Sequence, residues 1–220
     1  MIVRLATALQ VPLRERNALL LAAGYAALYR QNSLEAPEME EARRAIDFLL
    51  IQQEPYPGFV VDRYWNILMM NGGTRRFFSL FPNLVLPEHP NAIRLVFQPD
   101  GLRPFIANWE DVAARLIQRV HREAVTVPSD SRMASFRDEL LSYPGVPSRW
   151  RTPDLASAPP PFLTIDYRWN ECIVRLFAMI TTFGTPQDLT LQELRIECFF
   201  PADESTRCAF ALPQLRQSTP

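Results

Sequence analysis

The order of the β-rich segments most constrains what this 220-residue chain can fold into. Two runs rich in branched and aromatic residues, 58–62 and 65–70, are separated by a tight polar turn, and this pattern predicts a β-hairpin. Three further runs follow much later, at 162–167, 172–183 and 191–200. The long segment between the two groups has a helical pattern. This order predicts an α+β fold, in which one five-stranded antiparallel sheet contains a helical insertion and has helices packed on one face.

Helical segments are indicated by apolar residues that recur every three or four positions. The clearest covers residues 37–53, where a proline opens the segment, glutamates crowd the first turn and apolar residues form one stripe. Another begins at Asn108, and its basic residues, Arg119 among them, are most simply a solvated face. The remaining helical patterns are two short helices within residues 1–24 and one helix over 131–142.

Two polar residues in these segments have more than one interpretation. Asn71 precedes two glycines and Thr74, so it is most simply the N-cap of a short helix that runs through Phe78, and contact with a ligand is the alternative. Arg175 lies in the run 172–183, which is apolar on both faces and is therefore expected to be covered on both sides. A buried guanidinium needs a carboxylate or several carbonyls as partners. A structural ion pair, an exposed edge position and a ligand contact are all open for Arg175.

Composition and motifs exclude several classes of protein. The formal net charge of −1 gives no electrostatic footprint for nucleic acid or for an anionic membrane. No apolar run approaches the roughly 18 residues of a membrane span, and the N-terminus does not resemble a signal peptide, so we expect a cytoplasmic protein. The three cysteines form no C-x-x-C pair, which argues against disulfides and a zinc site. Because no catalytic or phosphate-binding motif is present, we expect no enzyme activity.

Three segments carry a more specific signal: LATALQVPLRERNALLLAAGYAALY at 5–29, LEAPEMEEARRAIDFLLIQQEPYPGFVVDRYWNILMMN at 34–71, and NWEDVAARLIQRVHREA at 108–124. They resemble MmyB-like transcription regulators, a bacterial family that joins an XRE-type helix-turn-helix domain to a PAS-like ligand-binding domain. The first segment is similar to the closing helices of the DNA-binding domain, the second to the connecting helix and first PAS hairpin, and the third to a central helix. The predicted order of strands is also the PAS layout. Beyond residue 142, only the position of Trp150 matches.

The resemblance implies a division of the chain into three parts. Residues 1–36 correspond to the tail of the helix-turn-helix DNA-binding domain, 37–54 to the connecting helix, and 55–220 to the PAS-like ligand-binding domain. The helix that reads DNA in the family lies upstream of the segment that begins this chain, so we expect the recognition helix to be absent from it. The expected partners are DNA, through that upstream domain, and a second copy of the chain in a homodimer.

The resemblance also implies an apolar pocket for a fatty-acid-like ligand, of long chain like myristate or palmitate, with no other cofactor required. Alternation places Trp65, Ile67 and Met69 on one face of their strand, and it places Phe177 and Met179 together on another. For each apolar candidate taken alone, a place in a filled core is the simpler alternative. The candidate ligand-binding residues are Phe59, Trp65, Ile67, Met69, Asn71, Phe77, Phe78, Trp109, Leu116, Phe136, Arg175, Phe177 and Met179.

Two functions follow as hypotheses. In the first, the chain is the sensor portion of a transcription regulator, and an acyl ligand in the pocket shifts the helix over 37–53. The candidates for holding the ligand's head group are Arg94, Arg103 and Arg175. In the second, the domain has a filled core and serves as a dimerisation or protein-docking module without a ligand. A cavity between the sheet and the helical insertion would favour the first hypothesis.

Overall fold

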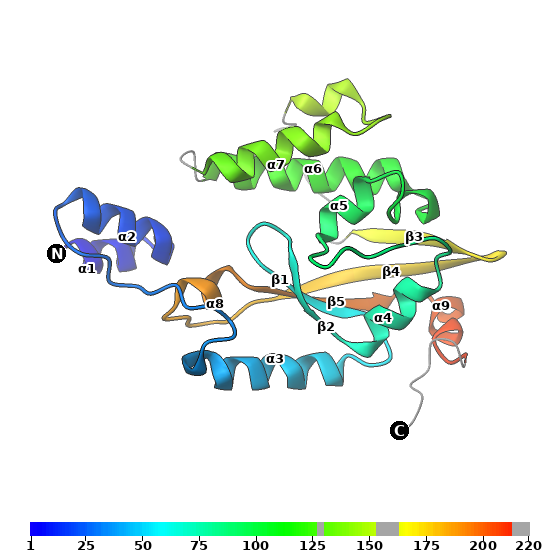
Figure 1. Cartoon of the computed structure of the whole chain (residues 1–220), viewed down its shortest axis with the longest axis horizontal. Coiled ribbons are helices and arrows are strands. Elements are labelled where there is room, and N and C mark those ends of the chain that lie inside the picture. The colour runs from blue at the N-terminus through cyan, green and yellow to red at the C-terminus, as the bar shows by residue number, and fades with distance from the viewer. Residues whose placement is uncertain (127–129, 153–162, 213–220) are drawn as a thin grey trace.

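The structure is a computed structural model that describes residues 1–126, 130–152 and 163–212. Its strands form a five-stranded sheet in the order β2-β1-β5-β4-β3, and every neighbouring pair is antiparallel (Figure 1). The strands are β1 (Gly58–Val61), β2 (Ile67–Met70), β3 (Thr164–Trp169), β4 (Cys172–Thr181) and β5 (Arg195–Pro201). The predicted α+β fold, with a hairpin, a helical insertion and three further strands, is confirmed.

Helices cover both faces of the sheet. Figure 1 shows α6 and α7 on one side and α3 on the other. The helices are α1 (Ile2–Ala8), α2 (Leu13–Ala22), α3 (Glu40–Gln52), α4 (Gly72–Ser79), α5 (Ala92–Phe97), α6 (Trp109–Thr126), α7 (Ser131–Ser142), α8 (Leu189–Glu193) and α9 (Glu204–Ala209). Ile46 and Leu50 of α3 pack on Val60 and Ile196 of the sheet in a cluster of their own. The prediction that helices pack on only one face of the sheet is therefore wrong, because the apolar stripe of α3 packs on the second face.

A β-bulge in the first hairpin changes which residues share a face. Val60 pairs with Met69, but Val61 pairs with Ile67, so the register shifts by one residue at this point. Ile67 joins the large core on the side of α6, whereas Met69 packs against the cluster under α3. A bulge leaves one residue of a strand unpaired and breaks the alternation of its side chains. The prediction that Ile67 and Met69 share a face is therefore wrong.

Asn71 is the N-cap of α4, as its position before two glycines predicts. Its Oδ1 accepts hydrogen bonds from the backbone nitrogens of Thr74, at 2.8 Å, and of Gly58, at 3.1 Å. Its Nδ2 donates to the carbonyl oxygens of Tyr56, at 2.9 Å, and of Leu50, at 3.2 Å. One buried amide therefore fastens the end of α3, the start of β1 and the start of α4 to one another.

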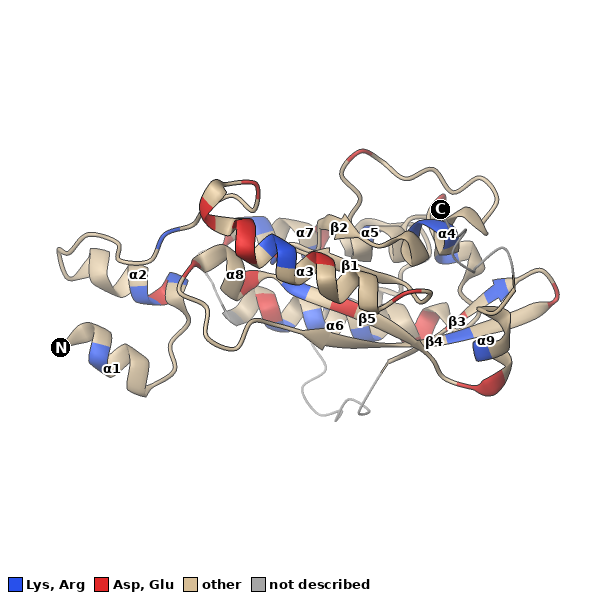
Figure 2. Cartoon of the chain, turned by 90° about the horizontal axis from the view of Figure 1, so that it is seen from below, with Lys and Arg blue, Asp and Glu red and all other residues tan. Residues whose placement is uncertain are grey.

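The chain from Pro37 to Gln52 forms a short 3-10 turn and α3, which confirms the helix expected there. Glutamates occupy its first turn and Arg43 and Arg44 follow, and Figure 2 shows acidic and basic residues interspersed along α3. This order of charges suits the dipole of the helix. None of the helices in the described ranges combines the length and the apolarity that crossing a membrane requires.

Candidate ligand-binding cavity

An apolar cavity of about 200 Å³ lies between the sheet and the helices α4, α5 and α6. Because side chains alternate along a strand, one face of the sheet supplies a whole wall. The strand residues of this wall are Phe59, Ile67, Ile165, Tyr167, Leu176, Ala178, Ile180, Glu197 and Phe199. The helical insertion supplies the opposite wall, chiefly through Phe77, Phe78, Ile93, Val96, Leu116 and Arg119.

The structure brings six of the thirteen candidate site residues together around this cavity. They come from the hairpin, from α4 and from α6, and are Phe59, Trp65, Ile67, Phe77, Phe78 and Leu116. Five of the six lie in the hairpin or in α4, which directly follows it, and Leu116 lies on the apolar stripe of α6. The first hairpin is therefore one wall of the cavity, as the sequence suggests.

Three candidates on β4 lie on the opposite face of the sheet. Leu176 and Ala178 line the cavity, so alternation turns Arg175, Phe177 and Met179 away from it. Both faces of this strand are apolar in sequence, and the pattern alone therefore could not show which face is inward. The expected placement of these three residues in the pocket is corrected.

Arg175 is exposed and forms ion pairs with two carboxylates. Its Nε lies 2.9 Å from Asp166 Oδ1, on the paired strand β3, and its NH1 lies 3.2 Å from Asp203 Oδ2, the N-cap of α9. These contacts raise the pKa of Arg175, with the hydrogen bond to Asp166 as the largest cause. Of the three possibilities left open for Arg175, the ion pair is the one that the structure shows, and Arg175 does not line the cavity. The expectation that this strand is covered on both sides is wrong, because Arg175 and Met179 are exposed.

Three further candidates pack elsewhere. Met69 lies on the α3 face because of the bulge, and the Asn71 side chain is fully used as a cap and tie. Trp109 packs beside the core and donates from its Nε1 to the Val96 carbonyl at 2.8 Å. None of these three lines the cavity.

The last aromatic candidate and the two other arginine candidates also lie outside the cavity. Phe136 is buried on α7 with the Arg94 guanidinium 5.0 Å from its ring centroid. Arg94 pairs with Glu139 at 2.6 Å, and Arg103 stacks 3.7 Å from the ring centroid of Trp109. The three arginines proposed for a head group are therefore all occupied by other partners.

The polar residues of the cavity are ones that the sequence did not single out. Arg119 lines it from α6, although the pattern of that helix predicts a solvated position. The Arg119 guanidinium lies 4.4 Å from the ring centroid of Trp65, and the Arg195 guanidinium lies 4.8 Å from the same centroid. Glu123 accepts a hydrogen bond from Trp65 Nε1 at 3.0 Å and pairs with Arg119 at 3.2 Å and Arg195 at 2.9 Å. Arg119 and the indole of Trp65 thus line the cavity, and the charged groups of Glu123 and Arg195 contact the same indole without lining it.

Trp65 is held in an uncommon backbone conformation. Its φ is 68°, in the left-handed region that bulky residues rarely adopt. The side chain is 1% exposed, and its stacking with two guanidinium groups is of the kind that stabilises such a site. Strained backbone of this type gathers at functional sites, where the surroundings determine it.

Glu197 is the most unusual group in the cavity. It is 8% exposed, and across the described residues it has neither a hydrogen-bond partner nor a cation at ion-pair distance. Burial raises the pKa of Glu197 to about 7, against the opposing charges of Arg119 and Arg195. The sequence signal for it was present, because a glutamate stands between apolar residues inside a β-rich run.

The sequence model of the family "MmyB-like transcription regulator ligand binding domain" matches residues 42–212. No curated protein matches the chain. Among solved structures, the PAS domain from Bordetella pertussis BvgS is similar, with a TM-score of 0.32 and 14% identity over 78% of this chain and 96% of that one. Because the family's model covers most of the sequence, this chain belongs to the MmyB-like transcription regulator ligand-binding domain family.

Proposed function

We propose that this domain is the sensor portion of a bacterial transcription regulator, and that its cavity binds a fatty-acid-like ligand. The observation that supports this proposal is the apolar cavity itself, which lies between the sheet and the helical insertion and has Arg119 and Glu197 in its lining. Pockets with mostly apolar walls and a few placed polar groups are typical of small-molecule sites. Such a ligand places its chain along the apolar walls and its head group beside Arg119.

The volume of the cavity limits the chain that fits without rearrangement. A protein cavity of about 150 Å³ holds benzene, so in proportion about 200 Å³ holds roughly eight carbon atoms. Burying eight methylenes contributes roughly 6 kcal/mol before the costs of binding, which are about 4 to 15 kcal/mol. A medium-chain acid therefore fits the cavity as it stands, and a myristate- or palmitate-like chain fits only after the helical wall moves outward.

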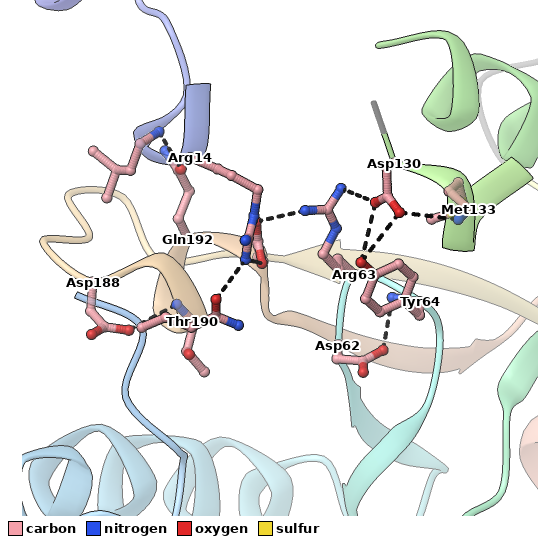
Figure 3. A network of polar contacts seen from close by, with 12 residues as sticks. Arg14, Asp62, Arg63, Tyr64, Asp130, Met133, Asp188, Thr190 and Gln192 are labelled. Carbon is pink, nitrogen blue, oxygen red and sulfur yellow. Dashed lines mark hydrogen bonds and ion pairs between the residues drawn. The ribbon is translucent and has the colours of Figure 1, made fainter. Parts of the chain in front are cut away.

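The N-terminal helices are connected to the ligand-binding domain by a chain of polar contacts (Figure 3). Arg14 of α2 pairs with Glu193 of α8 at 2.6 Å. Glu193 also lies 3.3 Å from Arg63 in the β1–β2 turn, and Arg63 pairs with Asp130, the N-cap of α7, at 2.6 Å. This turn also contains Trp65, which lines the cavity. These contacts support a route from the cavity to a helix-turn-helix DNA-binding domain upstream.

A cavity-filling variant with a matched control tests the proposal. Ala178 and Met179 are neighbours on β4, but only Ala178 faces the cavity. We expect the wild-type chain to bind saturated acids from hexanoate to palmitate by titration calorimetry, with the best fit near octanoate. We expect Ala178→Phe to abolish binding and Met179→Phe to leave it unchanged, with both variants retaining a cooperative melting transition.

Two outcomes would contradict the proposal. One is the failure of every acid to bind the wild-type chain, together with native mass spectra that show no co-purified ligand. The other is wild-type binding by Ala178→Phe, which would place the ligand outside this cavity. The first result would favour a dimerisation or protein-docking module without a ligand, for which the exposed apolar residues Phe48 and Ile51 on α3 offer a surface.

A further inference from the structure

We propose that Glu197 takes up a proton when a fatty acid enters the cavity, so that its carboxyl group donates a hydrogen bond to the ligand's carboxylate beside Arg119. This inference rests on the proposed function and specifies how the head group is recognised. It makes ligand binding by this sensor sensitive to pH. The inference is carried by the position of Glu197, its lack of partners and the balance of charges around it.

The strand register directs Glu197 toward the cavity. On β5, Ile196 and Cys198 pack in the cluster beneath α3, so alternation turns Glu197 to the opposite face. Across the sheet, Glu197 is paired with Phe59 of β1 and with Ile180 of β4, and both of these residues line the cavity as well. The carboxylate is thus surrounded by apolar strand neighbours and opens toward the cavity.

The absence of partners leaves this carboxylate available for a ligand. Within the described parts of the chain, no hydrogen bond or ion pair reaches the Glu197 oxygens, although this residue is only 8% exposed. Buried polar groups in proteins are nearly always satisfied, and an exception calls for an explanation. A ligand that completes the hydrogen bonding of Glu197 supplies one.

The surrounding charges favour an acid ligand only when Glu197 is neutral. The charged groups that act on it are Arg119 and Glu123 of α6 and Arg195 of its own strand. Tyr167 of β3, which lines the cavity and is neutral, and the half-buried thiol of Cys198 on the other face are the remaining titratable neighbours. With Glu197 ionised, two cations balance two carboxylates, so a ligand carboxylate adds an unbalanced negative charge in a water-poor site.

Proton uptake restores this balance. One proton from solvent forms an O–H bond on the Glu197 carboxylate, and that O–H then donates to the ligand carboxylate, which also faces the Arg119 guanidinium. The site binds one anion and one proton, and its net charge returns to zero. Two carboxyl groups that share one proton are a known arrangement, because two adjacent charges of like sign cannot both persist. A neutral ligand with a hydroxyl group would instead donate to ionised Glu197 and would take up no proton.

Titration calorimetry of the full chain with octanoate tests the inference. Titrations in phosphate and in Tris at the same pH give the number of protons taken up, because the two buffers differ in their ionisation enthalpy. The free Glu197 carboxyl, with its pKa of about 7, is ionised above neutral pH. We therefore expect uptake to approach one proton per ligand above about pH 8, and affinity to fall about tenfold per pH unit there.

Two variants and a neutral probe make the result decisive. In Glu197→Gln, we expect octanoate to bind without proton uptake and with an affinity that does not change between about pH 6 and pH 8.5. The exposed carboxylate variant Glu204→Gln should behave like the wild type. Octanoate binding by the wild type without proton uptake would overturn the inference, as would binding of octanol but not octanoate. If neither probe binds, the proposed function fails and the inference fails with it.

Discussion

Replacement of Asn71 by alanine should destabilise the domain far more than the loss of an ordinary helix cap. The side chain makes four hydrogen bonds to main-chain groups of three separate elements, at distances between 2.8 and 3.2 Å. Asn71 is 6% exposed, so water cannot replace the lost amide. The variant keeps the fold's apolar contacts and removes only this polar connection.

The expected loss in the free energy of unfolding follows from the groups that lose their hydrogen-bond partners. Loss of a cap costs about 0.5 to 2 kcal/mol. The carbonyls of Leu50 and Tyr56 lose a donor, and a buried group left unsatisfied costs about 1 to 3 kcal/mol. The Gly58 nitrogen keeps a second acceptor, the Thr74 Oγ1 at 2.9 Å, and this contact limits the loss. We expect Asn71→Ala to lower the free energy of unfolding by about 3 to 5 kcal/mol.

Urea denaturation monitored by circular dichroism measures this effect. With a slope near 2 kcal/mol/M, the midpoint should fall by about 2 M. Asp203→Ala is the control, because Asp203 caps α9 by accepting from Thr206 N at 2.8 Å at a much more exposed site. We expect about 1 kcal/mol for the control. A cost for Asn71→Ala no greater than that of Asp203→Ala would refute the reasoning.

Three further changes test other parts of the structure. Arg63→Ala leaves Asp130 as a nearly buried charge without its cation. The free energy of unfolding, measured by urea denaturation, should therefore fall by about 2 to 4 kcal/mol. A loss below about 1 kcal/mol would show that water replaces the guanidinium. Gly73→Ala places a Cβ atom 2.6 Å from the Pro55 carbonyl oxygen. We expect this clash to lower the free energy of unfolding by about 2 kcal/mol, and the melting temperature of the variant should fall by several degrees. The pKa of Glu197 is raised from 4.5 to about 7 on folding, so wild-type stability should fall by about 3 kcal/mol from pH 4.5 to pH 7, relative to Glu197→Gln. Parallel pH curves for these two proteins would contradict that last expectation.

The elements of the fold were predictable because their signals are local and repeated. The hairpin 58–70 is marked by two β-rich runs around a polar turn, and α3 by an apolar stripe behind a proline and several glutamates. Asn71 was predictable as a cap, because a short polar residue before a helix accepts a hydrogen bond from the backbone nitrogen of the second or third helical residue, here Thr74. In each case, the residues that decide the structure lie within a few positions of one another.

The composition of the site was less predictable, because it depends on which face each strand turns inward. A strand that is apolar on both sides gives no sign of its orientation, and the candidates on β4 were therefore placed on the wrong face. Arg119 and Glu197 were missed for a different reason. Polar residues are solvated more often than buried, and only the three-dimensional arrangement brings these two to the same cavity.

The bulge in β2 has a consequence for how sequences of this family should be compared. The extra residue is Leu68, which lies between the paired residues Ile67 and Met69. A relative without the bulge is therefore one residue shorter in this strand. An alignment that places the missing residue elsewhere would equate the position of Met69 with a residue that faces the cavity. Deletion of Leu68 from this chain would restore simple alternation. An insertion or deletion at this one position therefore changes which residues of the strand face the cavity.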